Sequence, residues 1–175
     1  RGIVAEDGWQ TVDKVLHPSR LEYYSTKPPL LTVLAAGEYW LLEKAFGWSI
    51  VDDRWAVVRT IVWTFNVLPL IVYLTLLARL ADGFGATDWG RLYVVAAACF
   101  ATLLTPFLIT FNNHTIATCG VVVALYTGLR IWSGDGVFSR DPEGSAGPAP
   151  PPRYLFALAG FFAGFTACAE LPATA

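Results

Sequence analysis

Charged residues are scarce in this chain of 175 residues, at 15% of the total. A soluble domain usually carries about a quarter charged residues. Hydrophobic residues make up 55% of the chain, and the mean hydropathy is +0.49. The shortage of charge, together with long apolar runs, excludes an ordinary soluble domain and predicts an integral membrane protein. The net charge of −2 provides no basic field, so we expect no nucleic-acid partner.

Cysteine is also scarce. The three cysteines, Cys99, Cys119 and Cys168, all lie inside apolar runs and form no Cys-x-x-Cys or Cys/His pattern. We interpret them as small hydrophobic packing residues, not as a disulfide framework or a zinc site. The sequence therefore predicts no metal-ligating residues and no certain cofactor, and a requirement for a divalent metal stays open.

Methionine is absent, and the chain begins with Arg1 and ends inside an apolar run. This pattern predicts an internal piece of a longer protein. The lack of a signal peptide then carries no information about targeting.

Long apolar runs are what the sequence has in abundance. They predict an all-α, polytopic integral membrane protein in which residues 57–175 form the transmembrane region. About four transmembrane helices are expected, at about 57–80, 92–111, 115–132 and 154–175. Pro69 lies in the middle of the first run and is expected to kink it.

The connections between these runs differ in length. Only residues 112–114 separate the second and third runs, which predicts a tight antiparallel helical hairpin. Residues 133–153 are rich in proline and predict an extended, solvated linker. Gly160 and Gly164 are four residues apart, a spacing that permits close packing of the last helix against a neighbour.

Residues 1–56 are expected to form an aqueous loop with juxtamembrane helices. In residues 1–30 we expect short helices or irregular structure, with a turn at His17-Pro18-Ser19. Residues 30–47 predict an amphipathic helix at the membrane interface, which Gly47 would end.

The distribution of arginine predicts the orientation. Residues 81–91 and 133–153 fall on one side of the membrane, which carries or borders several arginines, whereas the hairpin tip at 112–114 has no Lys or Arg. The positive-inside rule makes the arginine-rich side cytoplasmic. Residues 1–56, the hairpin tip and the end of the last run are then extracytoplasmic, although residues 1–56 carry cations of their own.

Five polar residues are expected to share the extracytoplasmic face and to bind substrate: Tyr24, Lys27, Asn113, His114 and Glu170. Lys27 is a compact cation suited to an anionic phosphate headgroup, or it simply snorkels to the interface. If the turn before Lys27 is helical, the Tyr24 hydroxyl can point the same way. Pro28 and Pro29 also have a structural interpretation, because proline favours the start of a helix.

The other members of this set also have two interpretations. An Asn-Asn-His sequence at a hairpin tip can simply cap the following helix, because asparagine is a favoured N-cap. Glu170 is an acid within an apolar run, which by default suggests a functional site in the membrane. It can equally lie at the aqueous boundary, and the sequence leaves both interpretations open.

The order of these features resembles a known family. The chain is similar to the N-terminal part of the GT-C fold, polyprenyl-phosphate-dependent glycosyltransferases of the aminoarabinose-transferase and protein-mannosyltransferase type, and to bacterial members in particular. The resemblance covers most of the chain, and Lys-Pro-Pro is its one fairly specific motif. It is carried by Tyr24-Ser25-Thr26-Lys27-Pro28-Pro29-Leu30, Gly37-Glu38-Tyr39-Trp40, Phe46-Gly47-Trp48 and Val58-Arg59.

The resemblance implies roles for individual residues. In that family the lysine of the Lys-Pro motif, with a tyrosine three residues before it, lies near the lipid phosphate, and these positions match Lys27 and Tyr24. A second acidic position of the family falls on residues 112–114, where no acid is present, which puts that role in doubt. The main catalytic acid is expected upstream of Arg1, so no catalytic residue is assigned in this chain.

The implied activity is the transfer of a sugar from a polyprenyl-phosphate donor to a lipid, glycan or protein acceptor on the extracytoplasmic side. The protein would be integral to the bacterial inner membrane, with membrane lipid and the lipid-linked sugar donor as partners, and this piece alone would be inactive. A polytopic transporter or flippase, or a non-catalytic membrane assembly protein, remains an alternative. A transporter would be expected to contain inverted repeats, and none is visible in the sequence.

Overall fold

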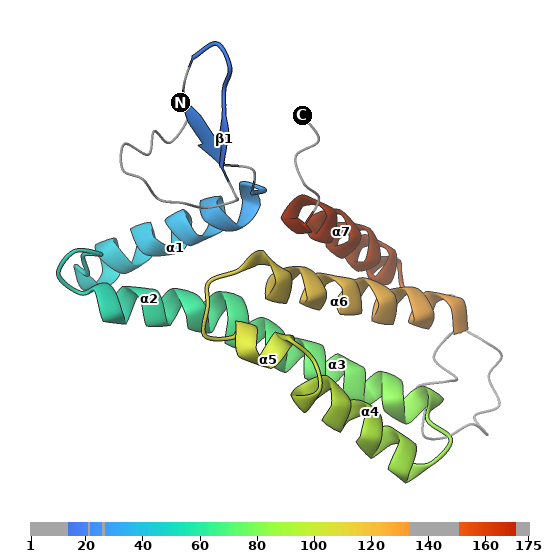
Figure 1. The fold of residues 1–175 in the computed structure, drawn as a ribbon. Coiled ribbons are helices and arrows are strands. Elements are labelled where there is room, and N and C mark those ends of the chain that lie inside the picture. Colours follow the sequence, from blue (N-terminus) through green and yellow to red (C-terminus); the bar gives the residue numbers. More distant parts are fainter. Residues whose placement is uncertain (1–13, 21, 26, 134–150, 171–175) are drawn as a thin grey trace.

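The computed structural model describes residues 14–20, 22–25, 27–133 and 151–170 and is mostly helical (Figure 1). Most of the expected linker, at 134–150, and the end of the expected last span, at 171–175, lie outside the described residues. The elements are β1 (Lys14–Leu16), β2 (Tyr23–Ser25), α1 (Leu30–Phe46), α2 (Arg54–Val62), the π-helix η1 (Trp63–Val67), α3 (Leu68–Phe84), α4 (Asp88–Phe100), α5 (Leu104–Phe107), α6 (Asn113–Ser133) and α7 (Arg153–Glu170).

Three helices in the described part of the chain are long and apolar enough to cross a membrane. They are Arg54–Phe84, Asp88–Phe107 and Asn113–Ser133. This confirms the predicted helical fold and agrees with an integral membrane protein. α7 is not one of the three, because Arg153 and Glu170 at its two ends lower the hydropathy of its 18 residues.

The expectation of helices or irregular structure before residue 30 is wrong for part of this segment. β1 and β2 form an antiparallel hairpin in which Val15 lies opposite Tyr24 and Leu16 opposite Tyr23. Branched and aromatic side chains favour such pairing. The turn predicted at His17-Pro18-Ser19 is confirmed, and His17 Nδ1 accepts the backbone N–H groups of Ser19 at 3.2 Å and Arg20 at 3.3 Å.

The predicted helix at residues 30–47 is confirmed as α1. It starts directly after Pro29 and ends at Gly47, which has a left-handed φ of 71° that favours glycine. One side of α1 buries Leu31 and Leu42. The opposite side exposes apolar residues too, so the helix is less clearly two-faced than the sequence predicts; Val33 and Trp40 are 64% and 56% exposed.

The first predicted span is longer than expected. α2, η1 and α3 form one continuous helix of 31 residues, from Arg54 to Phe84. At 1.5 Å per residue its length is about 46 Å, which exceeds the roughly 30 Å of a bilayer's hydrocarbon core. The irregularity expected at Pro69 takes the form of a π-helical turn just before it, where the Leu68 N–H bonds to the Trp63 carbonyl five residues back.

The second predicted span is interrupted near its end. α4 stops at Phe100, residues 101–103 bend, and α5 is a single turn at Leu104–Phe107. Pro106 explains the break, because it lacks the N–H needed by a continuous helix and disfavours helical geometry in the preceding residue. The connection to α6 is therefore residues 108–112, longer than the tight hairpin that the sequence predicts.

α6 lies at the centre of the helical bundle, between α7 on one side and α3 on the other (Figure 1). Its two ends belong to different clusters of buried residues. Near its start, Ile116 packs with Leu31 and Phe65, and further along Val122 and Tyr126 pack with Leu80. The beginning of α1, the π-helix η1 and the beginning of α6 therefore meet at one level of the bundle.

The close approach of α6 and α7 occurs at Gly120, not at Gly160 and Gly164. A Cβ atom on Gly120 would collide with Thr166 Oγ1 of α7, whereas Cβ atoms on Gly160 and Gly164 would meet no described atom within 4 Å. The prediction of close packing at Gly160 and Gly164 is therefore wrong within the described residues. The glycine that lets these two helices approach belongs to α6.

Candidate functional site

The structure joins the start of α6 to the end of α7 through a pair of ionisable side chains. Nδ1 of His114 lies 2.6 Å from Oε1 of Glu170, although the two residues are 56 positions apart. An ionised carboxylate can only accept hydrogen bonds, so Nδ1 carries the proton in this contact. The side chains of His114 and Glu170 are 49% and 35% exposed, which leaves the pair accessible from solution.

Asn113 makes the second connection between these helix ends. Its Nδ2 donates to the backbone carbonyl of Ala169 at 2.9 Å, and Ala169 is buried. The last carbonyls of a helix have no partner inside the helix. Asn113 therefore satisfies an unpaired carbonyl of α7 while its neighbour His114 holds the Glu170 side chain.

The helix dipoles favour the direction in which the Glu170 side chain points. An acid at the C-terminal end of α7 faces the negative end of its own helix, which is unfavourable. Glu170 instead reaches the first turn of α6, where the dipole is positive and His114 supplies a donor. Glu170 is the last residue of α7, and its interpretation as a residue at the aqueous boundary stays a prediction.

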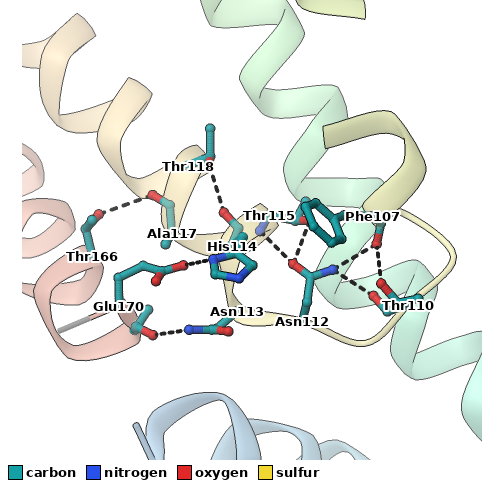
Figure 2. Close-up of polar contacts among 11 residues, drawn as sticks. Phe107, Thr110, Asn112, Asn113, His114, Thr115, Ala117, Thr118, Thr166 and Glu170 are labelled. Carbon is teal, nitrogen blue, oxygen red and sulfur yellow. Dashed lines mark hydrogen bonds and ion pairs between the residues drawn. The ribbon is translucent and has the colours of Figure 1, made fainter. Parts of the chain in front are cut away.

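Asn112 fixes the start of α6. Its Oδ1 accepts the backbone N–H of Thr115 at 3.1 Å, which is the bond of an N-cap residue. Its Nδ2 donates to the carbonyls of Phe107 and Thr110, both at 2.8 Å, so the cap is tied to the preceding connection (Figure 2). The predicted capping role of the Asn-Asn-His segment is confirmed, and His114 has its contact with Glu170 in addition.

Lys27 and Tyr24 lie in different surroundings relative to this site. Lys27 is exposed and lies four residues before Leu31, which packs against Ile116 in the first turn of α6. Tyr24 lies in strand β2, so the helical turn that would align its hydroxyl with Lys27 is not formed. The Tyr24 hydroxyl donates to Glu22 Oε2 at 3.0 Å, and its ring lies 5.8 Å from that of His17.

Of the five predicted site residues, the structure brings His114 and Glu170 into direct contact, and Asn113 bonds to Ala169, the residue before Glu170. It places the segment that follows Lys27 beside them through Leu31. The contacts described for Tyr24 lie within the hairpin of β1 and β2. No group of three or more His, Cys, Asp or Glu residues suited to a metal ion occurs in the described part of the chain.

The sequence did not predict the role of Asn66 or the contact of Glu38 with the π-helix η1. Asn66, in η1, is fully buried and donates to the carbonyls of Phe107, Leu108 and Thr110. Glu38, in α1, accepts a hydrogen bond from Thr64 Oγ1 of η1 at 2.8 Å. A signal for Asn66 was present, since a lone amide interrupts an apolar run three residues before Pro69.

Two oxygens in this region are buried without a hydrogen-bond partner among the described residues, Asn66 Oδ1 and Glu38 Oε2. Leaving a buried acceptor unsatisfied costs about 1–3 kcal/mol. An apolar side chain at position 66 would avoid that cost. It would also leave the carbonyls of Phe107, Leu108 and Thr110 without the Asn66 donor, so the amide stabilises the connection between α5 and α6.

In comparisons with protein-family models, curated proteins and solved structures, nothing matches this chain. The chemistry open to the site follows from its own groups. A protonated Nδ1 leaves Nε2 of the neutral imidazole as an acceptor, and the carboxylate of Glu170 orients the ring. The site can thus accept a hydrogen bond from a hydroxyl, with a cation, Lys27, on the segment that leads to the neighbouring helix.

Proposed function

We propose that this chain is part of a membrane glycosyltransferase that uses a polyprenyl-phosphate sugar as donor. The observation that carries the proposal is the contact of His114 with Glu170, at the level of the bundle where the Lys27-Pro28-Pro29 segment leads into α1. The site then combines a hydroxyl acceptor and a cation at one end of a set of membrane helices. A polyprenyl-phosphate sugar offers both of their partners, hydroxyls on the sugar and a phosphate at the membrane surface.

The proposed reaction makes one bond and breaks one. The acceptor oxygen bonds to the anomeric carbon of the sugar, and the bond from that carbon to the phosphate oxygen breaks with its electron pair leaving on the lipid phosphate. Lys27 stabilises this departing charge, which grows as the bond breaks. His114 Nε2 and Asn113 hold hydroxyls of the substrate, and the acceptor proton passes to a general base that is not assigned among the described residues.

The proposal includes a topology. We propose that three spans, with α7 as a fourth, cross a bacterial inner membrane, with the start of α6 and the end of α7 on the extracytoplasmic side that the positive-inside rule favours. α7 has 18 residues and is about 27 Å long, close to the thickness of the hydrocarbon core. It packs along α6 for much of that length (Figure 1). This packing favours a position in which α7 crosses the bilayer beside α6.

The test is the transfer of a labelled sugar from a polyprenyl-phosphate donor by the full-length protein in membrane vesicles. We expect Lys27→Ala to lower transfer by about a hundredfold, the loss typical for one group that stabilises transition-state charge. Lys44→Ala is the matched control, because Lys44 is also exposed but lies near the other end of α1. Equal amounts of each variant in the membrane must be shown by immunoblotting.

Two results would count against this function. Wild-type transfer by Lys27→Ala would remove the phosphate role. Movement of an intact lipid-linked sugar across the vesicle membrane, without transfer to any acceptor, would favour the flippase alternative over the enzyme.

A further inference from the structure

The π-helix η1 holds three different segments of the site through three consecutive residues. Thr64 donates to Glu38 of α1, and Phe65 packs against Leu31 of α1 and Ile116 of α6. Asn66 donates to the connection between α5 and α6. π-helical turns inside α-helices occur frequently at functional sites. Here the turn is the common anchor of the segments that carry Lys27 and His114.

Asn66 is the polar anchor of the α5–α6 connection. Its Nδ2 lies 2.6 Å from the carbonyl oxygen of Thr110, 3.1 Å from that of Leu108 and 3.3 Å from that of Phe107. The amide has only two hydrogens, so at least one of them is shared between two carbonyls. These three carbonyls fix the orientation of the amide, because its oxygen could not face them.

The same carbonyls connect Asn66 to the functional site. Phe107 and Thr110 also accept hydrogen bonds from Asn112, whose Oδ1 caps α6 through Thr115 (Figure 2). The Phe107 ring lies 5.7 Å from the imidazole of His114. A shift of the connection would therefore move both the cap of α6 and the aromatic neighbour of His114.

We propose that Asn66 is a positioning residue, which fixes residues 107–112 against η1 and thereby holds His114 in register with Glu170. Asn66 touches neither member of the pair in the contacts described and acts through the connection and Asn112. The buried amide donates to three backbone carbonyls of this connection, which supports the role. The effect on sugar transfer rests on the proposed function, whereas the effect on His114 does not.

The primary test is the nuclear magnetic resonance signal of the His114 Nδ1 proton in the detergent-solubilised protein. A proton shared with a carboxylate at 2.6 Å resonates far downfield. The signal is assigned by its loss in His114→Gln and is expected to disappear in Glu170→Gln. We expect Asn66→Leu, which keeps the number and branching of the side-chain heavy atoms but removes the donors, to lose this signal as well.

Thr75→Val is the matched control. Thr75 lies on the same continuous helix, and its hydroxyl bonds only to the carbonyl of Ile71 in the preceding turn among the described contacts. The signal should persist in this variant. A persistent signal in folded Asn66→Leu would overturn the positioning role.

Asn66→Ser is the second variant if Asn66→Leu does not fold. Serine can satisfy its hydroxyl on its own helix, but it is too short to reach all three carbonyls. Loss of the signal in the folded serine variant supports the proposal, and retention overturns it. Failure of both variants to fold would make Asn66 a folding residue and would also overturn the proposal.

Sugar transfer by the full-length protein provides the second measurement. We expect Asn66→Leu to lower transfer by about a hundredfold, the loss that a misplacement of about 1 Å can produce. Loss of the His114 signal in a protein that transfers no sugar even as wild type would uphold the positioning role and reject only the proposed function. Loss of the signal with unchanged transfer would uphold the positioning role of Asn66 and show that His114 does not take part in sugar transfer.

Discussion

Glu170 is the residue whose role the helix geometry changes most. In the sequence it is an acid within an apolar run, and an isolated acid of this kind would be costly inside a membrane. The structure gives it a donor on His114 and the positive end of α6 as surroundings. These contacts give the Glu170 carboxylate a hydrogen-bond donor at the end of α7, so its orientation is explained without a ligand.

The coupling between His114 and Glu170 is measurable by itself. A double-mutant cycle with His114→Ala, Glu170→Ala and the double variant should give a coupling of about 1 kcal/mol in the free energy of unfolding. The value is modest because both side chains are partly exposed, which screens the interaction. Equilibrium unfolding in detergent micelles provides the measurement. Strictly additive effects of the two substitutions would show that the contact contributes nothing.

At the scale of the element, the packing of α6 on α7 depends on a glycine, which has no side chain to separate the two helices. Gly120 lies opposite Thr166, whose hydroxyl points to the carbonyl of Ala117 at 3.4 Å. A larger residue at position 120 must displace Thr166 and then meet Phe165 and the backbone of Phe162. The contact that brings His114 to Glu170 lies at the end of this same interface.

We therefore expect Gly120→Val to destabilise the protein by about 1–3 kcal/mol, the usual cost of overpacking a buried site. Gly128→Val is the matched control on the same helix, because a Cβ at Gly128 meets no described atom within 4 Å. Thermal unfolding in detergent should show a Tm lowered by a few degrees or more for Gly120→Val. The same Tm for the two variants would mean that α6 and α7 do not approach at Gly120.

Sequence alone predicted the regular elements better than their irregularities. The end of α1 at Gly47, the third span and the membrane class follow from local signals of glycine, periodicity and hydropathy. The strand pairing of Val15 with Tyr24 and the π-helical turn at Asn66 depend on partners distant in the sequence. No local signal specifies such partners, because short strands and bulges are stabilised by the contacts they make.

The candidate site was predicted in part for the same reason. Topology sufficed to place Asn113, His114 and Glu170 at one end of the bundle, since α6 and α7 run antiparallel. It could not place Tyr24, whose expected helical turn is a strand, or reveal Asn66, whose donors face carbonyls more than 40 positions away. A backbone carbonyl can accept a hydrogen bond whatever its side chain is, so the sequence of the accepting residues does not reveal these contacts.

At the scale of the whole molecule, the bundle has a level at which the membrane boundary can be placed. Ile116, near the start of α6, packs against Phe65 of η1, so α2 extends past the start of α6 (Figure 1). From Trp63 to Phe84 the long helix has a length of about 33 Å, and the 21 residues of α6 span about 32 Å. Both lengths match a bilayer core of roughly 30 Å. We infer that the boundary lies near η1, with α2 outside it.

This boundary and the orientation predict the reactivity of single cysteines in a variant without Cys99, Cys119 and Cys168. In intact cells whose outer membrane is permeable, a membrane-impermeant maleimide should label Val51→Cys and Val58→Cys. It should label Ala86→Cys, in the connection between α3 and α4, only after the inner membrane is opened. Ile71→Cys should stay unlabelled in both conditions although Ile71 is 52% exposed in the protein, because a thiol in hydrocarbon does not ionise. Labelling of Ala86→Cys in intact cells would reverse the orientation, and an unreactive Val58→Cys would move the boundary from η1 to the start of α2.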